Sequence, residues 1–124
     1  MTTEQVAMRY MELEKQGKWV EIQDELYSAD IVCTEPEHAA AMGMQTVTKG
    51  LEAVKAKGQA WNETIAEVHG GYCTEPVIGG DYFSLAMGMD VSMKNGQRMK
   101  MDEIAVFGVK DGKIISEQFF FSEK

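Results

Sequence analysis

The sequence predicts an α+β domain in which helices come first and an antiparallel sheet follows. Apolar residues in the first half recur at helical spacing, whereas the second half holds four strand-like segments separated by the turn signals GGD, KNG and KDG. Connections this short make neighbouring strands antiparallel. The chain has 124 residues, enough for one hydrophobic core, so we expect a single domain over residues 1–124.

Two helices are expected at the start of the chain. Apolar residues fall mostly on one helical face over residues 3–16, with Thr2 or Thr3 as the cap and Gly17 as the stop. A second helix is expected over residues 19–28. Its inward face should consist of Trp19, Ile22, Leu26 and Tyr27.

A brief strand and a third helix complete the first half. The run DIVCTE, residues 30–35, is short and partly β-branched and ends at Pro36, which is typical of a strand. Residues 37–45 should form an irregular connection, and a third helix should cover about residues 46–61. The strands of the second half are expected near residues 64–77, 82–93, 99–109 and 114–122.

The segment MKMDEIAVF places a carboxylate at the centre of an apolar strand face. Every second residue of it faces the same way, which groups Met99, Met101, Glu103, Ala105 and Phe107. Turn length decides what lies beside them. Three-residue turns at 94–96 and 110–112 pair odd positions with odd positions and make one continuous apolar face, whereas two-residue turns would pair odd with even.

We favour the three-residue turns, which place two acids on the apolar face. Glu103 then lies opposite Phe119 and Glu117 opposite Ala105, so the two acids are diagonal neighbours. Burial and mutual repulsion would favour the protonated form of one of them, and an acid kept neutral near pH 7 can donate a hydrogen bond or a proton. The alternative is that Glu103 pairs with Arg98 or a helix lysine.

Composition and termini exclude several function classes. The formal net charge is -8, with 12 Lys and Arg against 20 Asp and Glu, which argues against nucleic acid or an anionic membrane as a partner. The opening MTTEQVAMRY lacks the features of a signal peptide, so we expect a cytoplasmic location. Two cysteines and two histidines in no recognisable spacing predict no metal site.

The order of these elements resembles the nuclear transport factor 2-like superfamily, which includes the SnoaL-like polyketide cyclases and the ketosteroid isomerases. The similarity rests on helix, helix, a short strand ending in an acid and Pro, a third helix, and a meander closed by DGKI, and it covers nearly the whole chain. It implies a cone-shaped, curved antiparallel sheet with three N-terminal-half helices packed on its concave face.

Three short motifs of the isomerases are similar to segments of this chain. RYMEL resembles the segment that carries an oxyanion-hole tyrosine, which falls on Tyr10. YSADIVCTEP resembles the segment that carries the proton-shuttling base, which falls on Glu35, and the second oxyanion donor falls on Glu103. The two acids are Glu where the family has Asp. The resemblance implies that Glu35 takes a proton from carbon beside a carbonyl while Tyr10 and protonated Glu103 stabilise the enolate oxygen.

Further residues are expected to contact a ligand. Tyr27 and Trp61 are aromatics that can form core and pocket wall together, and His69 faces either the ligand or solvent, depending on the GGD turn. The remaining candidates on the apolar face are Met87, Glu117 and Phe119. The sequence shows no phosphate-binding glycine loop, Ser-His-Asp order or metal signature, so we expect no cofactor and a small apolar molecule as ligand.

Two function classes stay open from sequence. One is a cofactor-independent isomerase or cyclase. The other is a non-catalytic ligand-binding protein or homodimeric interaction module of the same fold. The second is suggested by the opposite face of the predicted sheet, which is flat and only mildly polar and includes Ser84, Ala86, Gly88, Ile104 and Val106.

Overall fold

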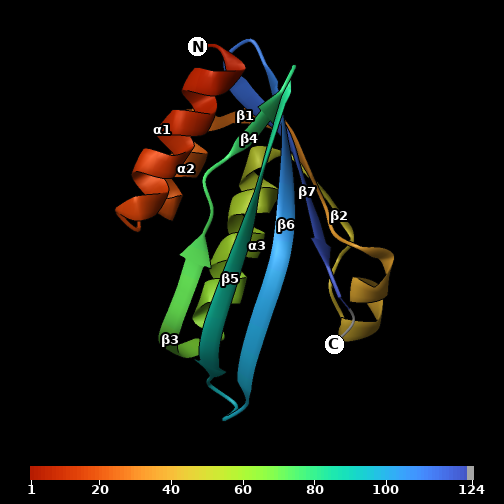
Figure 1. Ribbon diagram of the computed structural model, residues 1–124. Coiled ribbons are helices and arrows are strands. Elements are labelled where there is room, and N and C mark those ends of the chain that lie inside the picture. The colour runs from red at the N-terminus through yellow and green to blue at the C-terminus, as the bar shows by residue number, and fades with distance from the viewer. Residues whose placement is uncertain (123–124) are drawn as a thin grey trace.

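Helices pack on one side of a curved, seven-stranded sheet in the computed structural model, which describes residues 1–122 (Figure 1). The helices are α1 (Thr3–Lys15), α2 (Trp19–Leu26) and α3 (Leu51–Glu63), with a 3-10 helix, η1 (Glu37–Met42). The strands are β1 (Tyr27–Thr34), β2 (Val47–Lys49), β3 (Ile65–Cys73), β4 (Val77–Gly79), β5 (Tyr82–Met93), β6 (Arg98–Lys110) and β7 (Lys113–Phe121). The predicted α+β class is confirmed. Among the described helices, none has the length and apolar character needed to cross a bilayer.

The sheet has the strand order β2-β1-β7-β6-β5-β3, and β4 pairs with the start of β5. All neighbouring strands are antiparallel except β1 and β7, which run parallel. The sequence predicted only antiparallel pairs, because hairpin turns set direction only between strands that are consecutive in the chain. β1 instead joins the last strand, and this places Cys33 beside Glu117.

The first helix forms as predicted and is capped by Thr2. The Thr2 hydroxyl accepts a hydrogen bond from the backbone N–H of Gln5 at 3.1 Å, and the Gln5 side chain accepts one from the Thr2 N–H at 2.8 Å, which is a capping box. Gly17 follows the helix with a φ of +70°, a conformation that ends helices. The buried face consists of Val6, Ala7, Tyr10, Met11 and Leu13.

The second helix is shorter than predicted. It ends at Leu26, because Tyr27 and Ser28 already belong to β1. Tyr27 is buried as expected, whereas Trp19 is 36% exposed and faces inward only in part. Trp19 is the first residue of the helix, and its ring lies beside Gly58 of α3.

The third helix begins at Leu51, five positions after the predicted start at residue 46. Residues 47–49 pair with β1 as the strand β2 instead. Gly50 separates strand from helix with a φ of +93°, a left-handed conformation that favours glycine, and its N–H donates to the Ile31 carbonyl at 2.8 Å. The single strand predicted over 64–77 is also divided, because β3 ends before Pro76, which has no N–H to pair.

The turn between β5 and β6 has the predicted length. Residues 94–96 connect the strands, the Met93 N–H donates to the Gln97 carbonyl at 2.7 Å, and Gly96 has a φ of +91°. Odd positions therefore pair with odd positions, so that Met87 lies opposite Glu103. Glu103 accordingly shares the face that carries the buried Phe83 and Phe107.

The turn between β6 and β7 differs from the prediction. It is a two-residue turn of Asp111 and Gly112, with φ values of +52° and +76°, and it pairs Lys110 with Lys113. A bulge then adds one residue to β7, because Val109 pairs with Ile114 but Gly108 pairs with Ser116.

The bulge restores odd-to-odd pairing but shifts it by two residues. Glu103 lies opposite Phe121 rather than Phe119, and Glu117 lies opposite Phe107 rather than Ala105. The two acids share a face, but the prediction that they are diagonal neighbours is wrong. Ile115 is 37% exposed as a consequence, while Ile114 is buried.

Candidate active site

Three glutamates and one lysine gather on the concave face of the sheet. We call Glu35, Glu103 and Glu117 the acid cluster. Glu35 directly follows β1, Glu117 lies in β7 and Glu103 in β6, which are consecutive in the sheet. Glu35 and Glu117 are buried and Glu103 is half-buried. Lys57 joins them from α3, so the site has more acids than bases in a poorly hydrated environment.

Glu35 is held in an ion pair. Its Oε1 lies 2.6 Å from Lys57 Nζ, and its backbone N–H donates to the Thr46 carbonyl at 2.7 Å. Lys57 Nζ also lies 3.5 Å from Cys33 Sγ. Burial opposes the charge of Lys57, but the hydrogen bond to Glu35 and the neighbouring charges outweigh it, so the Lys57 pKa is raised. Lys57 therefore stays protonated and is the ion-pair partner of Glu35.

Glu103 has a different environment. Burial raises its pKa from 4.5 to about 7, the charges of Glu35 and Glu117 raise it further, and Lys57 opposes the shift. Within residues 1–122 the Glu103 carboxyl has no side-chain hydrogen bond or ion pair. The sequence suggested Arg98 as a partner for Glu103. Arg98 instead donates to Asp90, from Nε to Oδ1 at 3.0 Å and from Nη2 to Oδ2 at 2.9 Å. Glu103 is thus an acid that can be protonated near neutral pH.

Glu117 is satisfied inside the protein. The Tyr27 hydroxyl donates to its Oε2, and Cys33 lies beside it across the parallel pair of β1 and β7. Burial raises the Glu117 pKa more than hydrogen bonds from Tyr27 and Cys33 lower it. Burial, followed by the charge of Glu117, raises the pKa of the Cys33 thiol to about 12, so this thiol stays protonated. Glu117 therefore influences Glu103 mainly through its charge.

Tyr10 lies in an aromatic group at the end of the concave face nearest α1. Its ring centroid is 5.0 Å from that of Phe107 and 5.9 Å from that of Phe83. Burial, followed by the charge of Glu117, raises the Tyr10 pKa well above its usual value, so the hydroxyl stays protonated. Glu103 contributes to this shift, but no hydrogen bond joins the two side chains among the described residues.

One predicted ligand contact, His69, lies apart from the cluster, whereas Trp61 follows Lys57 by four positions in α3. His69 Nε2 is 2.7 Å from Ser92 Oγ, and its Nδ1 is 3.2 Å from Glu67, on the side of the sheet that faces away from the helices. His69 therefore lies on the opposite side of the sheet from the concave face. Trp61 is 37% exposed near the end of α3. Met87 and Phe119 do face the helices and are half-buried.

Sequence reasoning missed Lys57, although a signal for it exists. Val54 is the buried residue of α3, and Lys57 follows it by three positions, a spacing that puts both on one helical face. A buried glutamate at the end of β1 also needs a counter-ion. Within residues 1–122 no three His, Cys, Asp or Glu side chains are grouped as metal ligands.

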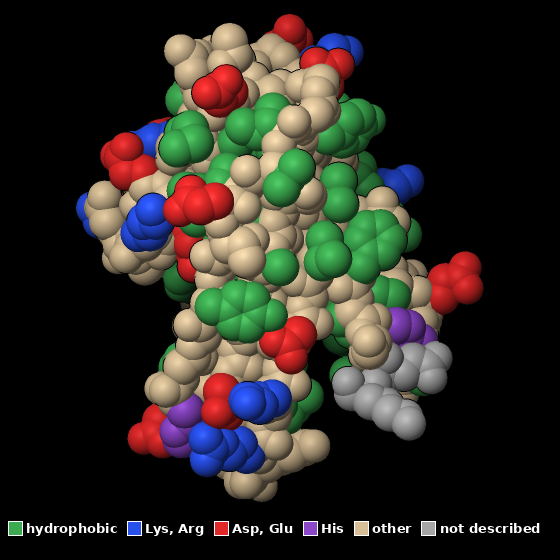
Figure 2. Space-filling view, in the orientation of Figure 1, with side chains coloured by type: hydrophobic (Ala, Val, Ile, Leu, Met, Phe, Trp, Pro, Cys, Tyr) green, Lys and Arg blue, Asp and Glu red, His purple; other side chains and the backbone are tan. Residues whose placement is uncertain are grey.

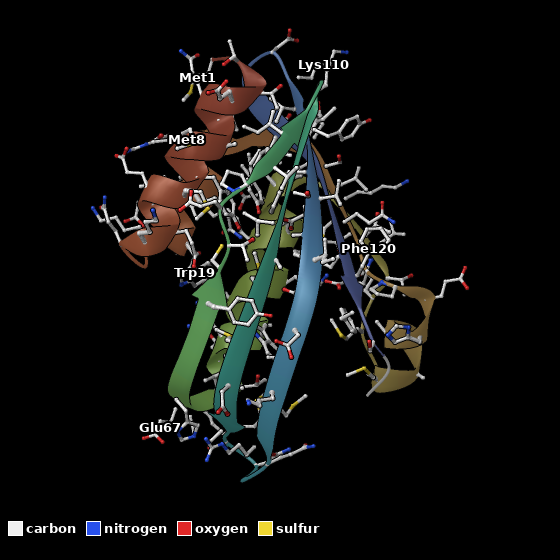
Figure 3. All side chains as sticks on the ribbon, viewed as in Figure 1. Met1, Met8, Trp19, Glu67, Lys110 and Phe120 are labelled. Carbon is white, nitrogen blue, oxygen red and sulfur yellow. The ribbon has the colours of Figure 1, made fainter. Side chains whose placement is uncertain are left out.

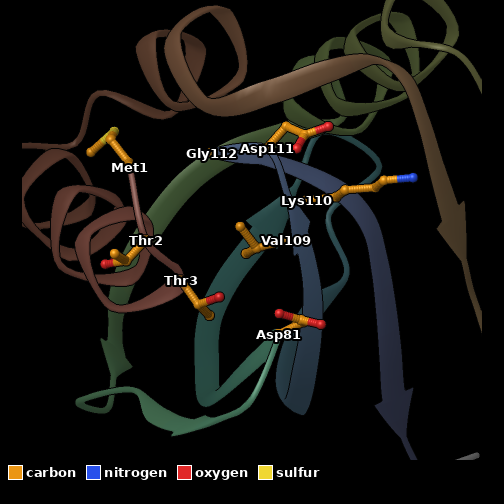
Figure 4. A pocket seen from close by; sticks show the side chains of 8 residues that line it. All are labelled: Met1, Thr2, Thr3, Asp81, Val109, Lys110, Asp111 and Gly112. Carbon is orange, nitrogen blue, oxygen red and sulfur yellow. The ribbon is translucent and has the colours of Figure 1, made fainter.

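Open hollows in the surface lie elsewhere. One surrounds the start of α1 and the β6–β7 turn and is lined by Met1, Thr2, Thr3, Asp81, Val109, Lys110, Asp111 and Gly112 (Figure 4). A second follows the exposed side of α1. Met1 and Lys110 lie at one end of the molecule and Glu67 at the other (Figure 3). Neither hollow includes a member of the acid cluster.

Helices on the concave face of a curved sheet, with acids between the two layers, define the class of this protein as an α+β domain. The model of the SnoaL-like domain family matches residues 1–121. The chain therefore belongs to the SnoaL-like domain family.

Solved structures agree with this assignment. A proposed SnoaL-like polyketide cyclase from Mesorhizobium loti, also described as a carbohydrate phosphatase, is 37% identical, with a TM-score of 0.87 over 97% of this chain and 99% of that one. A proposed SnoaL-like polyketide cyclase from Jannaschia sp. CCS1 is 13% identical, with a TM-score of 0.74 over 95% and 86%. A proposed isomerase from Bacillus subtilis is 16% identical, with a TM-score of 0.71 over 98% and 90%. No curated protein matched the chain.

Proposed function

We propose that this chain is a cofactor-independent enzyme that moves a proton at carbon next to a carbonyl group of a small apolar ligand. The observation that carries the proposal is the contrast between two acids on the same face. Glu35 is paired with Lys57, whereas Glu103 has no side-chain partner among residues 1–122 and a pKa of about 7. Two carboxyl groups in such different environments can take different roles in acid–base catalysis.

Each acid has a distinct role in the proposed reaction. The second carboxylate oxygen of Glu35 takes the proton from carbon, and the electron pair of the broken C–H bond moves to the carbonyl oxygen. Protonated Glu103 donates a hydrogen bond to that oxygen as its negative charge develops. Tyr10, whose hydroxyl stays protonated, is proposed as the second donor. Glu35 then returns the proton to the same or a neighbouring carbon, which completes an exchange or an isomerisation.

The surroundings of Glu103 favour an apolar ligand. The side chains beside it on the concave face are apolar and half-buried: Met87, Met89, Met99, Met101 and Phe119. Methionine side chains are flexible and polarizable, so they adapt to ligands of different shapes. The proposed cyclases and isomerase among the similar structures support chemistry of this kind.

Hydrogen–deuterium exchange of an apolar ketone tests the proposal. We expect the protein to accelerate exchange of the α hydrogens of 2-tetralone in D₂O, followed by proton NMR. Glu35→Gln should lower the rate by about 100-fold or more, the contribution usual for a general base. Glu37→Gln, which changes an exposed acid of the same loop, is the matched control. Equal rates for these variants, or no acceleration by the unaltered protein, would contradict the proposal.

The outer face of the sheet favours a second candidate, a homodimeric module. Large apolar side chains gather over β5, β6 and β7 on the face turned away from α3 (Figure 2). Ile104 and Phe120 are cross-strand neighbours and are 51% and 48% exposed. Contiguous apolar surface of this kind marks interfaces. We expect sedimentation velocity to show a dimer that Ile104→Lys dissociates, and a monomeric unaltered protein would contradict this candidate.

A further inference from the structure

His38 lies one side chain away from Glu103. It belongs to η1, which follows Glu35 and Pro36 directly. Its ring meets Phe121 edge-on, with centroids 5.2 Å apart and an interplanar angle of 88°. Phe121 is in turn the cross-strand partner of Glu103. His38 and Glu103 are therefore both neighbours of Phe121.

The Nε2 atom of His38 is buried and has no hydrogen-bond partner within residues 1–122. A buried polar atom without a partner costs free energy, and most such atoms in native proteins are satisfied. Gln23 Oε1 and Thr48 Oγ1 are also buried without a partner among the described residues, but of the three residues His38 is the one in contact with the cross-strand partner of Glu103. A hydrogen-bonding group of a ligand would satisfy this nitrogen.

We propose that His38 is a second polar contact for the ligand, through a hydrogen bond between Nε2 and a hydroxyl or carbonyl oxygen. The inference rests on the proposed function, since the first oxygen of the ligand is the one that Glu103 contacts. The ligand class is therefore an apolar compound with two oxygen groups, one at each end of the part that covers Phe121. A neutral imidazole can donate to a carbonyl or accept from a hydroxyl through Nε2, depending on its tautomer.

Naphthalene phenols are suitable probes because a phenol is a stable analogue of an enol. We compare 2-naphthol with 2,3-, 2,6- and 2,7-dihydroxynaphthalene, which place a second hydroxyl at different distances, by calorimetric titration. The unaltered protein should bind at least one diol about two- to tenfold more tightly than 2-naphthol, the effect of one net hydrogen bond. His38→Phe should abolish this preference and leave the 2-naphthol affinity within about twofold. His69→Phe, on the opposite side of the sheet, should retain the preference.

The thermal stability of His38→Phe gives a second, independent readout. Replacing an unsatisfied buried ring nitrogen with carbon should leave the melting temperature unchanged or raise it. A clear fall would mean that Nε2 has a partner inside the protein, which would overturn the inference. A diol preference that persists in His38→Phe, or that no diol shows in the unaltered protein, would also overturn it.

The outcomes separate this inference from the proposed function. Failure of 2-naphthol to bind would contradict the ligand site itself. A diol preference that depends on His38, together with absent exchange of 2-tetralone, would instead indicate a binding site without the proposed catalysis. Loss of exchange in Glu35→Gln without any effect of His38→Phe on the diols would keep the proposed function and refute the role of His38.

Discussion

The two ends of the concave face have different properties although they belong to one sheet. Near α1 the face is closed, because Phe83 and Phe107 stack with centroids 4.8 Å apart and are almost fully buried. Farther from α1 the same face is covered less completely, because Met101 and Phe121 are only half-buried, although Val91 near the β5–β6 turn is buried. The difference arises because α1 packs on β5 and β6, whereas α3 packs mainly on β1.

Polar groups follow this division. At the closed end the Glu117 carboxyl accepts a hydrogen bond from the Tyr27 hydroxyl, so a group of the protein itself satisfies it. At the half-covered end Glu103 and the Nε2 of His38 have no partner within the described residues. We infer that the stacked rings of Phe83 and Phe107 at the closed end stabilise the fold and that the half-covered end is available for ligand.

Truncating one phenylalanine at each end should give unequal losses of stability. Phe107→Ala removes a fully buried ring and should lower the free energy of unfolding by about 3–5 kcal/mol. Phe121→Ala removes a half-buried ring and should cost clearly less. Urea denaturation of both variants measures the difference, and equal losses would contradict the division of the face.

The pH dependence of stability should report Glu103. Because its folded pKa of about 7 exceeds the ordinary 4.5, its contribution to stability is complete below pH 4.5 and is lost as the pH rises through 7. Glu103→Gln should therefore become more stable than the unaltered protein as the pH rises from 5 to 8. One pKa unit corresponds to about 1.4 kcal/mol, so the relative change should reach at most about 3 kcal/mol.

The matched control for Glu103 is its neighbour in the chain. Asp102 faces the other side of the sheet, where it accepts a hydrogen bond from the Tyr72 hydroxyl at 2.7 Å. Asp102→Asn should not reproduce the pH-dependent gain. Direct carboxyl titration by carbon NMR offers a second measurement, and an ordinary Glu103 pKa there would refute the proposed role of this residue.

Removing the buried hydroxyl of Tyr27 should cost about 1–3 kcal/mol, because it leaves Glu117 buried without this donor. Tyr72→Phe breaks a tyrosine–carboxylate hydrogen bond of the same kind on the exposed face and should cost less. Chemical denaturation of both variants compares them. A larger loss for Tyr72→Phe would show that burial does not set the value of these bonds.

The smallest expected effect is that of replacing Lys57, which should change the pKa of Glu103. Lys57 opposes the raised pKa of Glu103, so Lys57→Gln should move that pKa upward, above 7. Lys55→Gln, which removes an exposed lysine of α3 that pairs with Asp24, is the control. The same carbon NMR titration reads both variants, and a downward shift in Lys57→Gln would contradict the assigned electrostatics.

The sequence by itself determined the features that depend on short stretches of chain. The capping residue Thr2, the stop at Gly17 and the three-residue turn at 94–96 all follow from residues close together in sequence. Strand alternation then places Glu103 on the face with Phe107 once that turn is known. The class of fold was predictable for the same reason, since helical and strand periodicities are local patterns.

Contacts between distant segments depend on how the whole chain packs. The bulge after the Asp111–Gly112 turn forms where β7 must satisfy both a tight turn and the pairing of β6, and it sets the partner of Glu103. The parallel pairing of β1 with β7 brings Cys33 to Glu117, and the packing of α3 on β1 brings Lys57 to Glu35. No local pattern encodes these neighbours, because they arise from which sheet edges and helix faces meet as the core closes.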